Sequence, residues 1–244
     1  MPTLKQVPKP VSKDYSPWIT NLPRLTHTRL LVRRFYRATC RLLLKVVARV
    51  QVQGMDRFPT QGPALIVTNH LGDTDIPFGL GGLPIAPEVL AKTELRDIPI
   101  LGWLMNAYGV IWLHRGRPDR RALSMALRAL AEGRYLVIAP EGRESLTGAL
   151  EAGMYGAAFL AIHSEAPIVP VTFTGTENWR VRRHLQQLQR LSLSLTVGPA
   201  FHLPRITNTR QAIRQGTQTI MRRLADQLPL NYQGIYAKKT EERS

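Results

Sequence analysis

The sequence predicts an α/β domain in which helices flank a central, mainly parallel or mixed sheet, preceded by an amphipathic N-terminal helix. Short apolar runs bounded by Pro and Gly alternate with longer stretches of helical periodicity, as expected for strands separated by helices. Several of these runs end abruptly at ionisable residues. With 244 residues and 44% hydrophobic content, the chain is long enough for one sizeable domain of this class.

Composition narrows the possible partners. The chain has 33 Lys and Arg against 17 Asp and Glu, a formal net charge of +16 that favours nucleic acid, anionic lipid or a phosphorylated substrate. Cys40 is the only cysteine, which excludes an internal disulfide and a multi-thiolate zinc site. The motifs of zincins, P-loops and Gly-x-Ser-x-Gly hydrolases are absent from the sequence.

The N-terminal part predicts a membrane-binding segment. Five prolines between residues 1 and 26 indicate an extended arm. Residues 28–50 predict a helix with a basic stripe (Arg29, Arg33, Arg37, Arg41, Lys45, Arg49) opposite an apolar one (Leu31, Phe35, Leu42, Leu43, Val46, Val47, Val50). Such a helix suits an anionic membrane interface, and the alternative is a helix packed on the domain with a solvated basic face.

These features predict three parts and a location. Residues 1–50 form the arm and the amphipathic helix, residues 51–228 the main domain, and residues 229–244 a flexible tail. We expect a peripheral (monotopic) membrane protein on the cytoplasmic face, because six cations in the first helix are incompatible with a spanning segment.

The main domain divides into alternating elements. We expect strands at 50–54, 64–68, 88–91, 110–113, 135–139, 168–173 and 193–197, and helices at 118–133, 153–163, 178–191 and 208–228. Residues 76–87 are uncharged and rich in Gly and Pro, which predicts a mobile apolar wall. The uncharged residues 98–112 predict a core segment or a contact for a lipid chain. Pro170 predicts an edge or irregular position for its strand.

The most informative segment follows the strand at 64–68. His70 comes directly after the strand end and Asp75 follows five residues later. In open α/β sheets the ligand crevice lies at the carboxyl ends of strands, so this imidazole is placed to act as an oriented base. The alternative is a hydrogen-bonded histidine with ordinary turn or cap residues, and Asp73 is a second candidate partner for the imidazole.

Four polar blocks at or near predicted strand ends carry a family resemblance. They are Asn69-His70 with Asp75, Gly109 to Arg115, Pro140 to Ser145, and Ile168 to Val171. In order and spacing they resemble the four blocks of the glycerolipid acyltransferases, typified by 1-acylglycerol-3-phosphate (lysophosphatidate) acyltransferase. The resemblance covers about residues 50–200, and Lys92-x-Glu-Leu95 with Gly102 matches the intervening pattern.

The resemblance implies roles for individual residues. His70 would deprotonate a glycerol hydroxyl that attacks an acyl thioester, and Asp75 would fix the imidazole tautomer. The substrate phosphate would be bound by Arg115, Lys92, Glu141, Gly142 and Arg143. Val169, Pro170 and Val171 would form an apolar wall.

The resemblance also implies the reactants. The donor would be acyl-CoA or acyl-carrier protein, the acceptor lysophosphatidate, and the surroundings an anionic membrane surface. Glycerol 3-phosphate and other lysolipids are alternative acceptors, and neither nucleic acid, metal nor redox cofactor is expected. A non-catalytic basic module is the rival from another class, but the sequence has no zinc-finger spacing or RNA-binding aromatic signature.

Two positions depart from the pattern of the family. Gly72 stands where a small polar residue is usual, two positions after the histidine. The third block reads Glu141-Gly142-Arg143-Glu144-Ser145 instead of Glu-Gly-Thr-Arg-Ser, so the arginine comes one position early. We therefore expect Arg115 and Lys92 to bind the phosphate, and Glu144 to turn outward or pair with an arginine.

Overall fold

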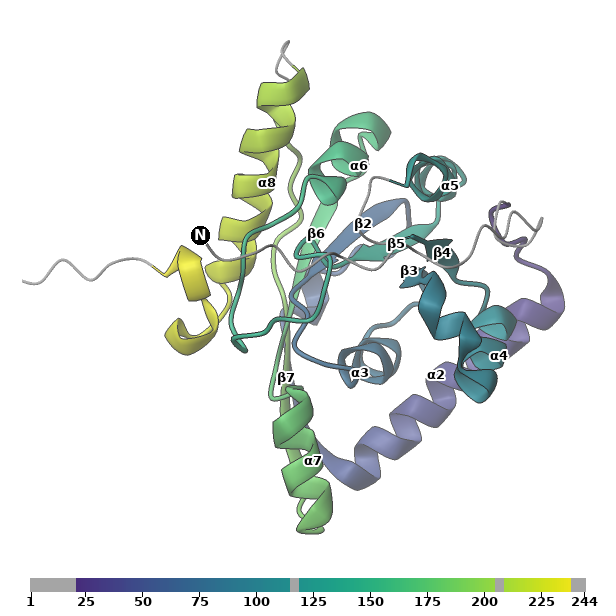
Figure 1. The fold of residues 1–244 in the computed structure, drawn as a ribbon, viewed down its shortest axis with the longest axis vertical. Coiled ribbons are helices and arrows are strands. Elements are labelled where there is room, and N and C mark those ends of the chain that lie inside the picture. Colours follow the sequence, from purple (N-terminus) through teal and green to yellow (C-terminus); the bar gives the residue numbers. More distant parts are fainter. Residues whose placement is uncertain (1–20, 115–118, 205–208, 238–244) are drawn as a thin grey trace, which may run out of the picture.

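A seven-stranded mixed sheet forms the centre of the computed structural model, which describes residues 21–114, 119–204 and 209–237 (Figure 1). The strand order is β1-β7-β6-β2-β5-β3-β4. The strands are β1 (Ala48–Gln53), β2 (Ala64–Thr68), β3 (Glu88–Lys92), β4 (Ile111–Leu113), β5 (Tyr135–Ile138), β6 (Ile168–Thr174) and β7 (Leu191–Val197). Neighbours from β6 to β4 are parallel, whereas β7 is antiparallel to β6 and parallel to β1. The predicted α/β class with a mixed sheet is confirmed.

Helices cover both faces of the sheet, so its central strands are buried on both sides. They are α2 (His27–Val47), α3 (Asp75–Gly82), α4 (Pro99–Tyr108), α5 (Arg120–Ala131), α6 (Gly156–Ser164), α7 (Asn178–Gln186) and α8 (Thr209–Ala225). In β2, Leu65 and Val67 pack with α5, α6 and α8 on one face, whereas Ile66 packs with Leu44 of α2 and Phe78 of α3 on the other. This alternation follows from the period of two along a strand.

Three details of the sequence-based fold were wrong. Part of the segment expected to be a mobile wall is the ordered helix α3, with Phe78 fully buried. Pro170 lies in the interior strand β6 and not in an edge strand. Proline is tolerated there because the ladder between β6 and β7 begins only at Val171, so the absent N–H breaks no pair. The start of the expected flexible tail is ordered: the 3₁₀ turns η3 (Leu230–Tyr232) and η4 (Gly234–Tyr236) follow α8, and Tyr232 is buried against Glu177.

Helix α2 is the element that differs most from expectation. Part of its basic stripe faces the domain: Arg33 is 3% exposed and forms a bidentate ion pair with Glu88 at 2.8 Å. Arg37 and Arg41 donate hydrogen bonds to the carbonyls of Leu83 and Gly81. A buried, doubly bonded guanidinium and carboxylate satisfy each other's polar groups, which lets the charged side of the helix pack inward.

The apolar stripe of α2 faces outward as a consequence. Leu31, Phe35, Leu42, Leu43 and Val46 are all exposed. The helix is therefore packed on the domain, as in the alternative prediction, but its solvated side carries the apolar stripe as well as Arg34, Arg41 and Lys45, where we expected a basic face alone. Binding of this helix to a membrane stays a prediction. Strand β1 continues directly from α2 and crosses the boundary expected at residue 50. Within the described residues, no helix has the length and apolar character needed to span a membrane.

Candidate active site

The carboxyl ends of the parallel strands bring three of the predicted site segments to one edge of the sheet. His70 lies two residues after β2, Lys92 ends β3, and Glu141 lies three residues after β5. Strand β5 pairs with both β2 and β3, so these segments are close neighbours. The sequence-based position of the site at this edge agrees with the topology. Arg115 lies outside the described residues.

His70 and Asp75 are in direct contact. Nδ1 of the imidazole lies 2.8 Å from Oδ2 of Asp75, and the same oxygen accepts the backbone N–H groups of Leu71 at 2.7 Å and Gly72 at 3.1 Å. Asp75 is 6% exposed and occupies the first turn of α3, where the helix dipole favours a negative charge. An ionised carboxylate accepts and does not donate, so Nδ1 carries the hydrogen of this contact.

This arrangement leaves the other ring nitrogen available. The His70 side chain is 19% exposed, and among the described residues no group is bonded to its Nε2. With the proton on Nδ1, neutral His70 presents an unprotonated Nε2 to the edge of the sheet. A base oriented by a buried carboxylate can accept a proton from a substrate hydroxyl. Asp73, the second candidate partner, is exposed, and its backbone N–H donates to Asn178.

Asn69, which belongs to the first polar block but was assigned no role from the sequence, fixes the end of β2. Its amide oxygen accepts from the N–H of Phe173 at 2.8 Å and its amide nitrogen donates to the carbonyl of Phe173 at 2.9 Å. The side chain thus pairs with β6 as a strand backbone would. Its position next to His70 was the available signal, but the partner lies 104 residues away.

Glu141 holds the peptide of His70 and does not face a substrate phosphate. Its Oε1 accepts from the N–H of His70 at 3.2 Å and its Oε2 from the N–H of Glu151 at 2.9 Å. The N–H of Ser145 donates to the carbonyl of His70 at 2.8 Å, so the loop after β5 binds this peptide from both sides. Burial raises the pKa of Glu141 to about 6, against the smaller lowering effect of the two backbone N–H groups.

The rest of the third block is also engaged within the protein. Arg143 forms an ion pair with Glu151 instead of lying free for an anion. Gly142 has a positive φ of 71°, and a side chain there would collide with Met154. The carboxylate of Glu141 and the guanidinium of Arg143 are therefore both engaged within this loop, and a phosphate-binding role for Glu141, Gly142 and Arg143 stays a prediction.

Asn178 connects the two departures from the family pattern. Its Oδ1 accepts from the N–H of Asp73 at 3.0 Å, and its Nδ2 donates to Glu144 at 3.0 Å. A Cβ added at Gly72 would lie 2.6 Å from this Oδ1, so only glycine leaves room for the amide. Glu144 therefore pairs with an asparagine where we expected solvent or an arginine. The sequence offered no signal for Asn178, which begins α7.

The three residues expected to form an apolar wall are core residues. Val169 and Val171 have no exposed surface and pack with Ile66 and Phe173, and Pro170 is buried between them. Their side chains lie in the core because both faces of the sheet are covered, and a role as a wall for a bound substrate stays a prediction. Over residues 21–114, 119–204 and 209–237, no cluster of three or more His, Cys, Asp or Glu side chains is arranged to hold a metal ion.

The fold and the His70–Asp75 pair define an α/β protein with an oriented histidine at the carboxyl edge of its sheet. The family model "Acyltransferase" matches residues 49–174, half of the chain, and contains both residues of the pair. The chain belongs to this acyltransferase family.

Individual relatives agree with this family. The chain is 30% identical over 131 residues to 1-acyl-sn-glycerol-3-phosphate acyltransferase BAT2, chloroplastic, of Brassica napus, covering 52% of the chain and 38% of the relative. It is 41% identical over 104 residues to the lyso-ornithine lipid O-acyltransferase of Pseudomonas aeruginosa, covering 42% of the chain and 38% of the relative. The chain thus spans well under half the length of these relatives.

A solved structure supports the fold. The crystal structure of the 1-acyl-sn-glycerophosphate acyltransferase PlsC from Thermotoga maritima has a TM-score of 0.59 at 20% identity, covering 83% of the chain and 84% of the other protein.

Proposed function

We propose that this chain transfers a fatty acyl group from a thioester donor, acyl-CoA or acyl-carrier protein, to the free hydroxyl of lysophosphatidate, which gives phosphatidate. The observation that carries the proposal is the His70–Asp75 contact at the edge of the sheet in a chain of the acyltransferase family. The curated relatives named 1-acyl-sn-glycerol-3-phosphate acyltransferase support this choice of acceptor.

The proposed mechanism is general-base catalysis. Nε2 of His70 removes the proton of the acceptor hydroxyl while the oxygen attacks the thioester carbonyl. The tetrahedral intermediate then expels the thiolate, which takes the proton from the imidazolium. Asp75 holds Nδ1–H throughout, so it stabilises the charged imidazolium and keeps Nε2 directed at the substrate. Glu141 and Asn69 position the peptide of His70 and do not contact the reacting atoms.

The phosphate of the acceptor requires cations at the same edge. Lys92 ends β3 there, and no hydrogen bond joins its side chain to another described residue. We infer that Lys92, with Arg115, binds the phosphate, because Arg143 is already neutralised by Glu151. Lys92→Ala and Arg115→Ala should each raise the KM for lysophosphatidate far more than Arg143→Ala, as measured by steady-state kinetics.

A lysolipid without a glycerol phosphate is the second candidate acceptor. The relative with 41% identity is named a lyso-ornithine lipid O-acyltransferase. The internal engagement of Glu141 and Arg143 also leaves fewer groups for a phosphate. Both candidates use the same base, so they differ only in which acceptor is bound.

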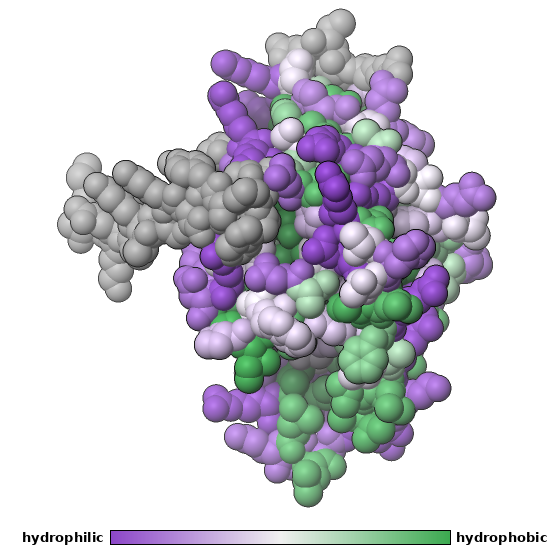
Figure 2. Space-filling model, turned by 90° about the vertical axis from the view of Figure 1, so that its right-hand side faces the viewer, coloured by the Kyte–Doolittle hydropathy of each residue, from purple (hydrophilic) through white to green (hydrophobic). Residues whose placement is uncertain are grey.

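The membrane-facing surface in this proposal is the exposed apolar stripe of α2 together with α4. Ile100 and Trp103 of α4 are 76% and 68% exposed, and α4 lies beside α2. Figure 2 views this side of the molecule and shows hydrophobic surface gathered in its lower half. An apolar surface of this kind, on a chain of net charge +16, supports peripheral binding at the cytoplasmic face of an anionic membrane.

One assay tests the proposed reaction. The purified chain is incubated in detergent micelles with labelled acyl-CoA or acyl-carrier protein and, separately, lysophosphatidate, glycerol 3-phosphate or lyso-ornithine lipid, and the lipids are extracted. Label in phosphatidate is the expected result, and label in ornithine lipid alone would select the second candidate. Folded protein that transfers no acyl group to any acceptor from either donor would contradict acyl transfer.

A further inference from the structure

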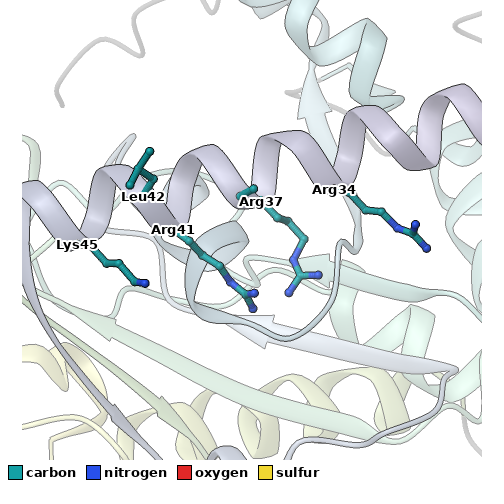
Figure 3. A pocket seen from close by; sticks show the side chains of 6 residues that line it. Arg34, Arg37, Arg41, Leu42 and Lys45 are labelled. Carbon is teal, nitrogen blue, oxygen red and sulfur yellow. The ribbon is translucent and has the colours of Figure 1, made fainter.

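A basic groove runs along the side of α2, next to its exposed apolar stripe. The groove has a volume of about 400 Å³ and is lined by Arg34, Arg37, Ala38, Arg41, Leu42 and Lys45. Figure 3 shows the four cationic side chains leaving the same side of α2, while Leu42 points away from them. The groove is lined by cations from one helix and lies on a different element from His70.

Among the residues that the structure describes, no acidic side chain lines this groove. Helix α2 contains no Asp or Glu in its 21 residues. Within the described part of the chain, the side chains of Arg34 and Lys45 take part in no hydrogen bond or ion pair. Four cations packed together repel one another, so an anion in the groove would be bound favourably.

Arg37 and Arg41 are held in place by hydrogen bonds that use only some of their N–H donors. Arg37 donates one Nη2 hydrogen bond to Leu83, and Arg41 bonds the carbonyls at the end of α3, so both guanidinium groups have fixed positions. A guanidinium has five N–H donors, and Nε of Arg37 is buried without a partner. Burial, followed by the charge of Arg41, lowers the pKa of Arg37, and a bound anion would relieve that repulsion.

The position of the groove indicates which anion it receives. At about 100° per residue, Lys45 and Arg34 lie about a quarter turn or less from the line through Leu31, Phe35, Leu42 and Val46. Arg41 lies slightly further round the helix, and Arg37 lies well over a quarter turn away. Those four apolar residues are exposed, and Leu42 belongs both to the apolar stripe and to the groove. A phosphate in the groove would therefore have an apolar surface beside it, as a lipid headgroup with attached acyl chains requires.

We propose that this groove binds the headgroup phosphate of one anionic glycerophospholipid of the membrane. The lipid's acyl chains lie beside Leu42 and its neighbours in the apolar stripe, and its phosphate receives hydrogen bonds from Arg41 and Lys45, which are one turn apart. Arg34 and Arg37 line the same side of the helix and add electrostatic attraction. This inference rests on the membrane association proposed above, and it adds a specific lipid contact to the general attraction between a basic protein and an anionic surface.

The test compares two double variants with the same change of charge. Arg34→Gln with Lys45→Gln removes the two unpaired cations of the groove. Arg210→Gln with Arg214→Gln removes two exposed cations of α8, on the opposite face of the sheet from α2 (Figure 1). Co-sedimentation is measured with phosphatidylcholine vesicles, with and without phosphatidylglycerol, at low salt and at about 1 M salt.

The groove variant should bind phosphatidylglycerol vesicles about 30-fold more weakly at low salt, and the α8 variant within about twofold of wild type. Screening at about 1 M salt acts beyond about 3 Å, so contacts in the groove should keep a several-fold difference there. Equal losses in both variants, or a groove effect that vanishes at high salt, would mean diffuse electrostatics and would overturn the proposal.

Two further arms separate the remaining explanations. Calorimetric titration with inorganic phosphate detects a site for the free ion. The lipid proposal would also be overturned if the wild-type chain binds phosphate, the groove variant does not, and the wild-type chain shows no preference for vesicles that contain phosphatidylglycerol. Acyl transfer in detergent micelles should be unchanged in the groove variant, because none of its residues contacts the active site. If even the wild-type chain transfers no acyl group, the vesicle measurements still test whether the groove binds an anionic lipid.

Discussion

Two His–Asp pairs with the same five-residue separation occur in this protein, and their surroundings give them different chemistry. His70 and Asp75 follow β2, whereas His114 and Asp119 follow β4. In the first pair, Oδ2 of Asp75 lies 2.8 Å from Nδ1, and among the described residues its other donors are backbone N–H groups. Within this part of the chain, no Lys or Arg side chain pairs with the carboxylate that orients His70.

The second pair is a helix cap. Oδ1 of Asp119 accepts the N–H groups of Arg121 and Ala122 at the start of α5. Nη2 of Arg121 lies 3.1 Å from Nδ1 of His114 and 3.2 Å from Oδ2 of Asp119, so it competes for the contact between them. Burial raises the pKa of Asp119, but backbone N–H groups, the His114 ring and Arg121 outweigh it and lower the pKa overall.

The comparison shows that the spacing of His and Asp does not define a base. One ring nitrogen cannot both donate to Asp119 and accept from Arg121, so the tautomer of His114 is not fixed by its carboxylate as that of His70 is. The pairs also differ in burial, because His114 is 11% exposed and His70 19%. Variants at matched positions in the two pairs turn this comparison into measurements.

The largest effect with both histidines in place should come from Asp75→Asn. An amide no longer requires the proton on Nδ1, so Nε2 loses its role as a base, and kcat should fall by up to about 10⁴-fold. Asp119→Asn keeps a good helix cap and should stay within a few-fold of wild-type activity. Acyl-transfer rates of the two variants decide the matter, and similar losses in both would remove the distinction between the pairs.

The next effect tests how Asn178 supports the first pair. Gly72→Ser should destabilise the protein by about 1–3 kcal/mol, because the added side chain collides with the Asn178 amide. Combining it with Asn178→Ala should recover only part of that loss, because the added Cβ would still lie 2.7 Å from the backbone carbonyl oxygen of Thr176. Urea unfolding of the two single variants and the double variant measures the coupling, and strictly additive effects would show that the two residues act independently.

The smallest effect concerns Glu141 and pH. Burial raises the pKa of this carboxyl from 4.5 to about 6, so the folded chain binds the proton more tightly than the unfolded chain. The associated stability is complete below about pH 4.5 and is lost as pH rises through about 6, about 2 kcal/mol in total. Glu141→Gln should remove this component, so its stability relative to wild type should improve from pH 4.5 to pH 7.

Urea titrations of both proteins across this range check the sign. A stability difference in favour of the wild type that grows with pH would mean that the carboxyl is not held as the structure shows.

The same variant, Glu141→Gln, should lower kcat by about tenfold, since one of the two backbone N–H groups of His70 and Glu151 would face an amide NH₂.

Periodicity and strand-end chemistry were enough to predict most elements and the position of the His70–Asp75 pair in the fold. The pair follows β2 at the carboxyl edge of the parallel strands, as the sequence predicted, and its catalytic role stays a prediction. The same reasoning failed for α2, because an amphipathic pattern does not say which stripe faces the domain. The answer depends on Glu88, 55 residues from Arg33 in the sequence.

Side-chain partners outside the local motif account for the other contacts that the sequence did not predict. Glu141 accepts from the peptide of His70, 71 residues away, and Arg143 pairs with Glu151. Asn178 lies 105 residues from Asp73 and 34 from Glu144, so no local pattern could connect them. Such contacts are set by tertiary packing, and a single sequence does not contain the evidence for them.

The most direct test of the account compares His70→Ala with His114→Ala in single-turnover acyl transfer from labelled acyl-CoA. The His70 variant should fold normally and lose about 10²–10⁴-fold in rate, because a positioned base is removed. The His114 variant should keep a rate within a few-fold of wild type and lose only some stability at the start of α5. Wild-type turnover by the His70 variant, or an inactive but folded His114 variant, would contradict the assignment of His70 as the base.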